Sequence, residues 1–196
     1  AQTARSLSQG RGATTQTIWV LRTAYPLTLP PPDVRRPLLW PLILSGFFRV
    51  LGATDWVATF ASGCMGCLGA ALFFVLARRF MQPLEAFLTT LVLVLQPQII
   101  LMNQSGLSEP LFICQLLLIA HAGLRAGRPW HFLMLGLLLG LAQWVRLNGF
   151  PLAVPVALGL AVRRRPGWWS SLLLLMAGFA LVGLPLALRN YQHLGE

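Results

Sequence analysis

Six long apolar runs, separated by short polar turns, occupy most of the chain after residue 55. Their length and scarcity of charge predict membrane-spanning helices, because about 20 apolar residues cross the hydrocarbon core of a bilayer. The fourth and fifth runs are shorter than a span requires, and we expect neighbouring residues to extend them or other helices to shield them. The predicted spans are residues 56–77, 84–102, 110–124, 130–145, 150–162 and 170–188.

The arginines in the connections predict how these spans are oriented. Two or three arginines lie in the turns after the first, third and fifth runs, whereas the intervening turns hold only Arg146 and Arg189. Because arginine-rich connections stay in the cytoplasm, the other turns are predicted to be external. The predicted external side therefore carries the polar segment 103–110, the turn 146–149 and a tail at 191–196.

The first 55 residues form a predicted external or juxtamembrane segment. Within it, residues 37–51 are apolar but only about 15 in number, too few for most spans, and they include Pro41 and Arg49. This pattern favours an amphipathic helix lying in the membrane interface. The alternative is a seventh span, which would move the six arginines of residues 1–55 to the cytoplasmic or interfacial side and satisfy the orientation rule.

Composition supports an integral, multi-pass membrane protein, which we place in the plasma (inner) membrane of a bacterium. Hydrophobic residues make up 56% of the chain, charged residues only 10%, and the mean hydropathy is +0.69. The net charge of +10 could suggest nucleic acid, but the arginines lie singly or in short clusters beside apolar runs. We therefore predict no nucleic-acid partner and expect membrane lipids instead. The resulting fold class is an all-α, polytopic transmembrane helix bundle over residues 56–190.

Small residues recur at helical spacing in two of the runs. Ser62, Gly66 and Ala70 form one stripe, and Gly136 and Gly140 form another. Such stripes let helix backbones approach closely in lipid, and we expect packing within the chain rather than dimerisation. The three cysteines lie in apolar stretches and are interpreted as small packing residues, so no metal site is predicted.

Glu109 is the first candidate functional residue, because it is one of only five acidic residues and lies between two apolar runs. An ionised carboxylate beside a bilayer is costly and is usually kept for a function. A structural alternative stays open, in which Ser108 caps the next helix, Glu109 faces its positive end and Pro110 occupies its first turn. Asn103, in the same polar segment, is a candidate for substrate binding with the same ambiguity.

Arg35 and Arg36 are candidate phosphate ligands, since they follow a stiff triple proline and directly precede the predicted interfacial helix. Guanidinium groups bind phosphate oxygens through two parallel hydrogen bonds, and at this depth the phosphate would carry a lipid tail. Ordinary anionic lipid heads are the alternative ligand. Arg146 could join such a site from its external turn, or simply extend to the membrane surface.

The order of several short patterns resembles the polytopic membrane glycosyltransferases of the GT-C type that are related to protein O-mannosyltransferases. These patterns are the opening segment 1–12, Arg36-Pro37-Leu38-Leu39, Gly52, the Pro97 run, Ser108-Glu109-Pro110-Leu111-Phe112, and Gly140-Leu141-Ala142 leading to Arg146. The resemblance implies transfer of a sugar from a polyprenyl-phosphate donor to a lipid, glycan or protein acceptor at the external face. It also implies that residues 37–51 are interfacial.

The same resemblance implies a span before residue 1, followed by an external loop with a catalytic acidic residue. On this basis the general base is expected upstream of Ala1, the donor headgroup is expected near Arg35, Arg36 and Arg146, and the chain alone is expected to be inactive. No cofactor is expected within this chain, and a divalent metal is left open for the complete enzyme. The competing interpretations are a transporter or flippase for an anionic substrate and a nonfunctional membrane remnant.

Overall fold

The computed structural model describes residues 2–14, 37–146, 150–163 and 168–194, and the regular elements in these ranges are helices. This confirms the predicted all-α bundle. The helices are α1 (Gln2–Ser8), α2 (Leu39–Leu51), α3 (Asp55–Ala77), α4 (Pro83–Leu95), α5 (Pro97–Gln104), α6 (Glu109–Arg125), α7 (Pro129–Gln143), α8 (Phe150–Arg163) and α9 (Trp168–Leu194).

The predicted run 84–102 is the one apolar run that does not form a single helix. It divides into α4 and α5, which meet at an angle of 63°. Gln96, between them, has an extended backbone with φ −62° and ψ 128°. A residue before proline avoids the helical conformation, and Pro97 has no N–H to continue the hydrogen-bond ladder. The prediction of one continuous helix was therefore wrong at Gln96.

Two helices are long and apolar enough to cross a membrane within the described residues: α3, and α9 over Trp168–Arg189. The bent α4–α5 pair would make a third span if its two parts cross together. Apolar side chains along α4 are exposed, which would be unfavourable in water and suits contact with lipid. They are Leu84, Phe87, Leu88, Leu91, Val92 and Leu95. The protein is an integral membrane protein, and the count of six spans stays a prediction.

The tightest helix pair is α7 with α9, where glycines bring the two backbones together. A Cβ at Gly140 would lie 2.8 Å from the Phe179 carbonyl oxygen, and one at Gly178 would lie 2.9 Å from the Leu137 nitrogen. A Cβ at Gly136 would collide with the Leu175 carbonyl. The predicted Gly136–Gly140 stripe therefore packs within the chain, as expected for helix contacts in lipid.

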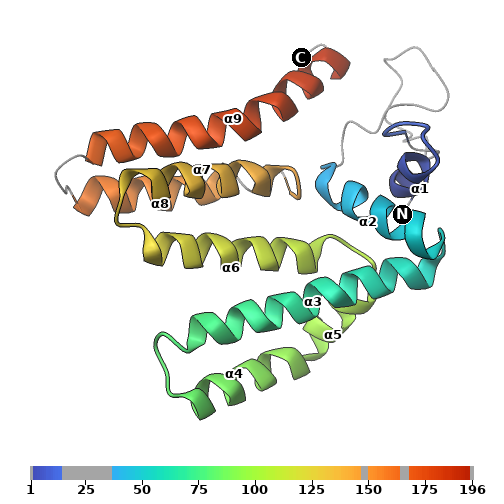
Figure 1. The fold of residues 1–196 in the computed structure, drawn as a ribbon, viewed down its shortest axis with the longest axis horizontal. Helices are drawn as coiled ribbons and strands as arrows, with labels where there is room; N and C mark the ends of the chain where they lie inside the picture. Colours follow the sequence, from blue (N-terminus) through green and yellow to red (C-terminus); the bar gives the residue numbers. More distant parts are fainter. Residues whose placement is uncertain (1, 15–36, 147–149, 164–167, 195–196) are drawn as a thin grey trace.

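Two of the arginine-rich turns lie together at one end of the bundle, as their alternation along the chain predicts. Figure 1 shows the α3–α4 and α6–α7 turns at one end, and the sequence places Arg78, Arg79, Arg125 and Arg128 at these turns. Helices α1 and α2 and the α5–α6 loop lie at the opposite end (Figure 1). We call this second end the mouth. Which end faces the cytoplasm stays a prediction.

Helix α2 has one face buried in the protein and another that is exposed and apolar. Trp40, Leu44 and Phe48 are buried in a cluster with Ala4 of α1 and with the first turns of α3. Leu42, Val50 and Leu51 are exposed. A 13-residue helix is roughly 20 Å long, shorter than the roughly 30 Å hydrocarbon core. These features support the interfacial interpretation of residues 37–51 over a seventh span.

Candidate functional site

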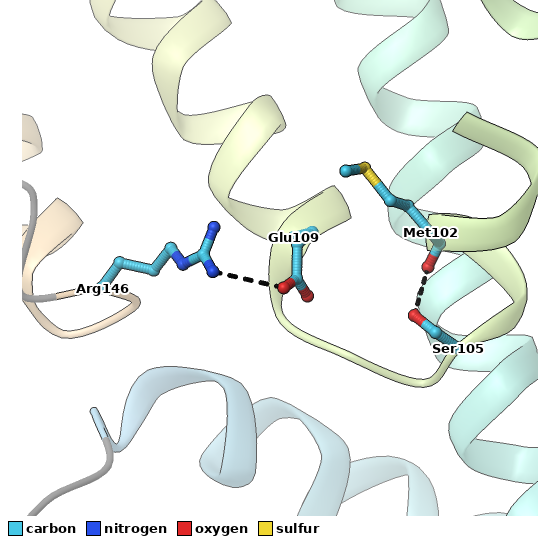
Figure 2. A network of polar contacts seen from close by, with 4 residues as sticks. All are labelled: Met102, Ser105, Glu109 and Arg146. Atoms are coloured by element: carbon cyan, nitrogen blue, oxygen red, sulfur yellow. Dashed lines mark hydrogen bonds and ion pairs between the residues drawn. The ribbon is translucent and has the colours of Figure 1, made fainter. Parts of the chain in front are cut away.

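Glu109 and Arg146 form an ion pair at the mouth (Figure 2). Arg146 Nη2 lies 3.3 Å from Glu109 Oε1, although the two residues are 37 positions apart. Glu109 is the first residue of α6, and Arg146 follows the end of α7. The structure therefore brings together two of the predicted site residues from separate polar turns.

Local backbone geometry presents both side chains to this contact. The Arg146 N–H donates to the Ala142 carbonyl over 2.9 Å and closes the last turn after α7. Its guanidinium carbon lies 5.9 Å from the centre of the Phe112 ring, within the range of a cation–π contact. Glu109 occupies the first turn of α6, where the positive end of the helix dipole stabilises a carboxylate.

The pair is arranged so that the acid is sheltered and the cation is accessible. The Glu109 side chain is 21% exposed and that of Arg146 is 43% exposed. Glu109 Oε2 is buried and has no hydrogen-bond partner among the described residues. A guanidinium carries five N–H donors, so Arg146 can hold Glu109 and still offer donors to a second anion.

The structural alternative for residues 108–110, in which these residues only start the next helix, is confirmed in one part and wrong in another. Ser108 precedes α6, but its side chain makes no capping hydrogen bond, so the predicted Ser108 cap was wrong. Its backbone is already helical, with φ −83° and ψ −6°, whereas a side-chain cap is normally made from an extended backbone. Pro110 does lie in the first turn of α6, as predicted. Upstream, the Ser105 hydroxyl donates to the Met102 carbonyl (Figure 2).

A cavity of about 220 Å³, which we call the mouth cavity, lies at the mouth, and neither Glu109 nor Arg146 is part of its lining. It is bounded by α1, the start of α2, the α5–α6 loop and the end of α7, and its lining includes Ser108 and Val145, the residues directly before Glu109 and Arg146. The full lining is Thr3, Ala4, Pro37, Trp40, Pro41, Leu44, Gly106, Leu107, Ser108 and Val145. The wall thus combines an indole, prolines and hydroxyl groups, a mixture suited to an amphipathic ligand.

Asn103, the third predicted site residue in the described chain, lies in a different cavity. This second space, of about 310 Å³, is partly open, is lined by α3, α4, α5 and α6, and has an almost entirely apolar lining. A Cβ at Gly66 would collide with the Asn103 carboxamide, so the absent side chain at Gly66 makes room for it. Asn103 therefore does not join the Glu109–Arg146 pair.

The predicted phosphate ligands Arg35 and Arg36 lie outside the described residues. The next residue, Pro37, is described and lines the mouth cavity. Within the described ranges, no group of three His, Cys, Asp or Glu side chains is arranged to hold a metal ion.

Sequence reasoning missed a second ion pair at the mouth and one neutral contact. Arg5 Nη2 lies 2.7 Å from Asp55 Oδ1 and joins α1 to the start of α3. Arg5 and Asp55 carry opposite charges and lie on the same predicted external side, and this could have indicated that they pair. The Trp40 indole N–H donates to the Gly106 carbonyl over 3.1 Å. No sequence pattern indicates that contact, because it joins positions 66 residues apart.

Fold and site define an integral membrane helix bundle with a charged mouth. The chain belongs to the dolichyl-phosphate-mannose-protein mannosyltransferase family, whose model matches residues 35–188. It is therefore a membrane glycosyltransferase of the GT-C type, and the transferase interpretation is favoured over the transporter. No curated protein and no solved structure matches the chain.

Proposed function

We propose that this protein transfers a sugar from a polyprenyl-phosphate donor to a lipid, glycan or protein acceptor at the external face of the membrane. The observation that carries the proposal is the Glu109–Arg146 pair at the mouth, where the residues directly before Glu109 and Arg146 line the mouth cavity. A half-exposed cation at this end suits a lipid phosphate, and the nearby cavity offers room for the group attached to it. The family description, which names a lipid-phosphate sugar, supports this donor class.

In the proposed reaction, Arg146 binds the donor phosphate and Glu109 holds the guanidinium in place. Negative charge builds up on the phosphate oxygens as the bond between sugar and phosphate breaks. Preorganised cations stabilise that developing charge more than they stabilise the intact donor, which lowers the barrier. Arg35 and Arg36 are included as further phosphate ligands, because they directly precede Pro37 of the cavity wall.

Glu109 is assigned to orientation and not to proton transfer, because one of its oxygens contacts Arg146 and the other is buried. The proposal therefore gives the role of general base to the acidic residue that the resemblance implies before residue 1. That base would take the proton from the acceptor hydroxyl as it attacks the sugar. A divalent metal remains an open component of the complete enzyme.

The test is a binding measurement with a polyprenyl monophosphate and the full-length protein in lipid nanodiscs. Arg146→Ala should weaken binding about tenfold or more, because a charge-assisted hydrogen bond to phosphate is lost. The double variant Arg35→Ala/Arg36→Ala should weaken it by a similar factor, since it removes two guanidinium groups. The matched control is Arg125→Ala/Arg128→Ala, which removes two arginines at the opposite end of the bundle. Unchanged affinity in both mouth variants would exclude the proposed headgroup site.

A further inference from the structure

Trp40 holds the loop that leads into Glu109. Its side chain is buried, and the indole N–H donates to the carbonyl of Gly106, three residues before the acid. Gly106 has φ +65°, and a Cβ there would come within 3.3 Å of the Ala58 Cβ. The loop is therefore held between α2 on one side and α3 on the other.

The residue before Trp40 holds the segment that leads into Arg146. The Leu39 N–H donates to the Trp144 carbonyl over 2.8 Å, and Trp144 lies two residues before Arg146. The Trp144 indole in turn donates to the Val182 carbonyl of α9, also over 2.8 Å. Two consecutive residues at the start of α2 thus contact the two backbone segments that carry the ion pair.

We propose that Trp40 is a positioning residue, whose indole N–H sets the separation of Glu109 and Arg146 by fixing the Gly106 carbonyl. The consequence for donor binding rests on the proposed function, whereas the effect on the separation does not. Leu39 acts through its backbone N–H, which every residue except proline supplies, so Trp40 is the side chain on which this arrangement depends. A charged site needs its groups held within about 0.5 Å of their productive positions, and a buried hydrogen bond from a packed ring meets that need.

Packing and hydrogen bonding by Trp40 must be separated, because the ring also belongs to the cluster with Ala4, Leu44 and Phe48. Trp40→Phe keeps an aromatic ring and removes the N–H donor. If that variant does not fold, replacement of Trp40 by benzothienylalanine exchanges the N–H for sulfur and retains the ring shape. Ser62→Ala is the matched control, since it removes another side-chain hydrogen bond to a backbone carbonyl, that of Met102, deeper in the bundle.

The first measurement reports the separation and needs no donor. Glu109→Cys and Arg146→Cys are introduced together into full-length protein in which Cys64, Cys67 and Cys114 are replaced, and a short bifunctional thiol reagent links the new cysteines. Loss of the indole N–H should slow cross-linking about fivefold, the scale of one lost hydrogen bond. Ser62→Ala should leave the rate unchanged. An unchanged rate without the indole N–H would overturn the positioning role.

The second measurement is a double-mutant cycle on the affinity for a polyprenyl monophosphate. Trp40→Phe should weaken binding about fivefold when Arg146 is present and have no effect in the Arg146→Ala background. Equal weakening in both backgrounds would overturn the idea that Trp40 acts through the ion pair. If Arg146→Ala alone leaves affinity unchanged, the phosphate-binding role given to Arg146 in the proposed function fails, and the cross-linking rate still decides whether Trp40 sets the separation.

Discussion

The two ion pairs described above, Arg5–Asp55 and Glu109–Arg146, both lie at the mouth. The pair with the shorter contact distance has the more exposed acid. Arg5 and Asp55 are closer, at 2.7 Å, but the Asp55 side chain is 91% exposed. Glu109 and Arg146 are 3.3 Å apart, with Glu109 only 21% exposed. An exposed carboxylate is almost as well solvated by water as by its partner, so a short distance adds little stability. The exposed fraction of the acid is therefore a better guide than the contact distance to how much each pair contributes to stability.

The two pairs also differ in what surrounds them. The Arg5–Asp55 contact fastens α1 to the start of α3, and nearby Arg49 donates to the Leu7 carbonyl at 3.4 Å. Each pair leaves one buried atom without a hydrogen-bond partner in the described chain, Glu109 Oε2 and Arg5 Nε, so the pairs differ in their carboxylates: Glu109 is sheltered and Asp55 is exposed. The proposed function gives the ligand-binding role to the pair with the sheltered acid, and the exposed pair is left with a structural role.

The largest expected effect on stability comes from Arg146→Ala. This change leaves the sheltered Glu109 carboxylate unpaired, which should lower the free energy of unfolding by roughly 1–3 kcal/mol. Reversible denaturation of the protein in detergent micelles measures the difference. A loss no greater than that of Arg5→Ala would contradict the importance given to burial.

A smaller loss is expected for Glu109→Gln, because the cation that it leaves unpaired is half-exposed and can be solvated by water. The amide also keeps the shape of the carboxylate. We expect a decrease of roughly 0.5–1 kcal/mol in the same denaturation measurement. If Glu109→Gln proved as costly as Arg146→Ala, the proposed asymmetry between a sheltered acid and an accessible cation would be wrong.

The smallest effects are expected at the exposed pair. Arg5→Ala and Asp55→Asn should each change the free energy of unfolding by no more than about 0.5 kcal/mol, and raised salt should reduce even that difference. The affinity for a polyprenyl monophosphate should not change in either variant. Weakened binding in Asp55→Asn would show that the exposed pair belongs to the ligand site after all.

Periodicity and length predicted the helices well because each apolar run must satisfy its own backbone hydrogen bonds wherever lipid replaces water. The effect of proline was harder to predict. Pro97 coincides with a break, whereas Pro155 and Pro185 lie inside continuous helices. Each proline removes a backbone donor, but the packing of neighbouring helices decides whether the helix continues past it.

The candidate site was predictable in its members but not in its pairing. Charged residues are rare between the apolar runs, and this rarity singled out Glu109 and Arg146. A charge beside a bilayer is costly and is usually kept for a function. Nothing in the spacing indicated that these two would meet while Asn103 entered a separate apolar cavity. Asn103 lies on α5, and the bend at Gln96 that sets the direction of α5 was not predicted.

The amino-acid sequence by itself determined that this is an all-α membrane protein, where its helices lie apart from the break at Gln96, and which few polar residues are candidates for a site. These properties depend on local hydrophobicity and backbone chemistry, which each segment carries with it. Only the tertiary structure decided that α2 contacts both charged segments, that Glu109 is sheltered and that Asp55 is not. Contacts and burial depend on which distant segments pack together, and no single segment contains that information.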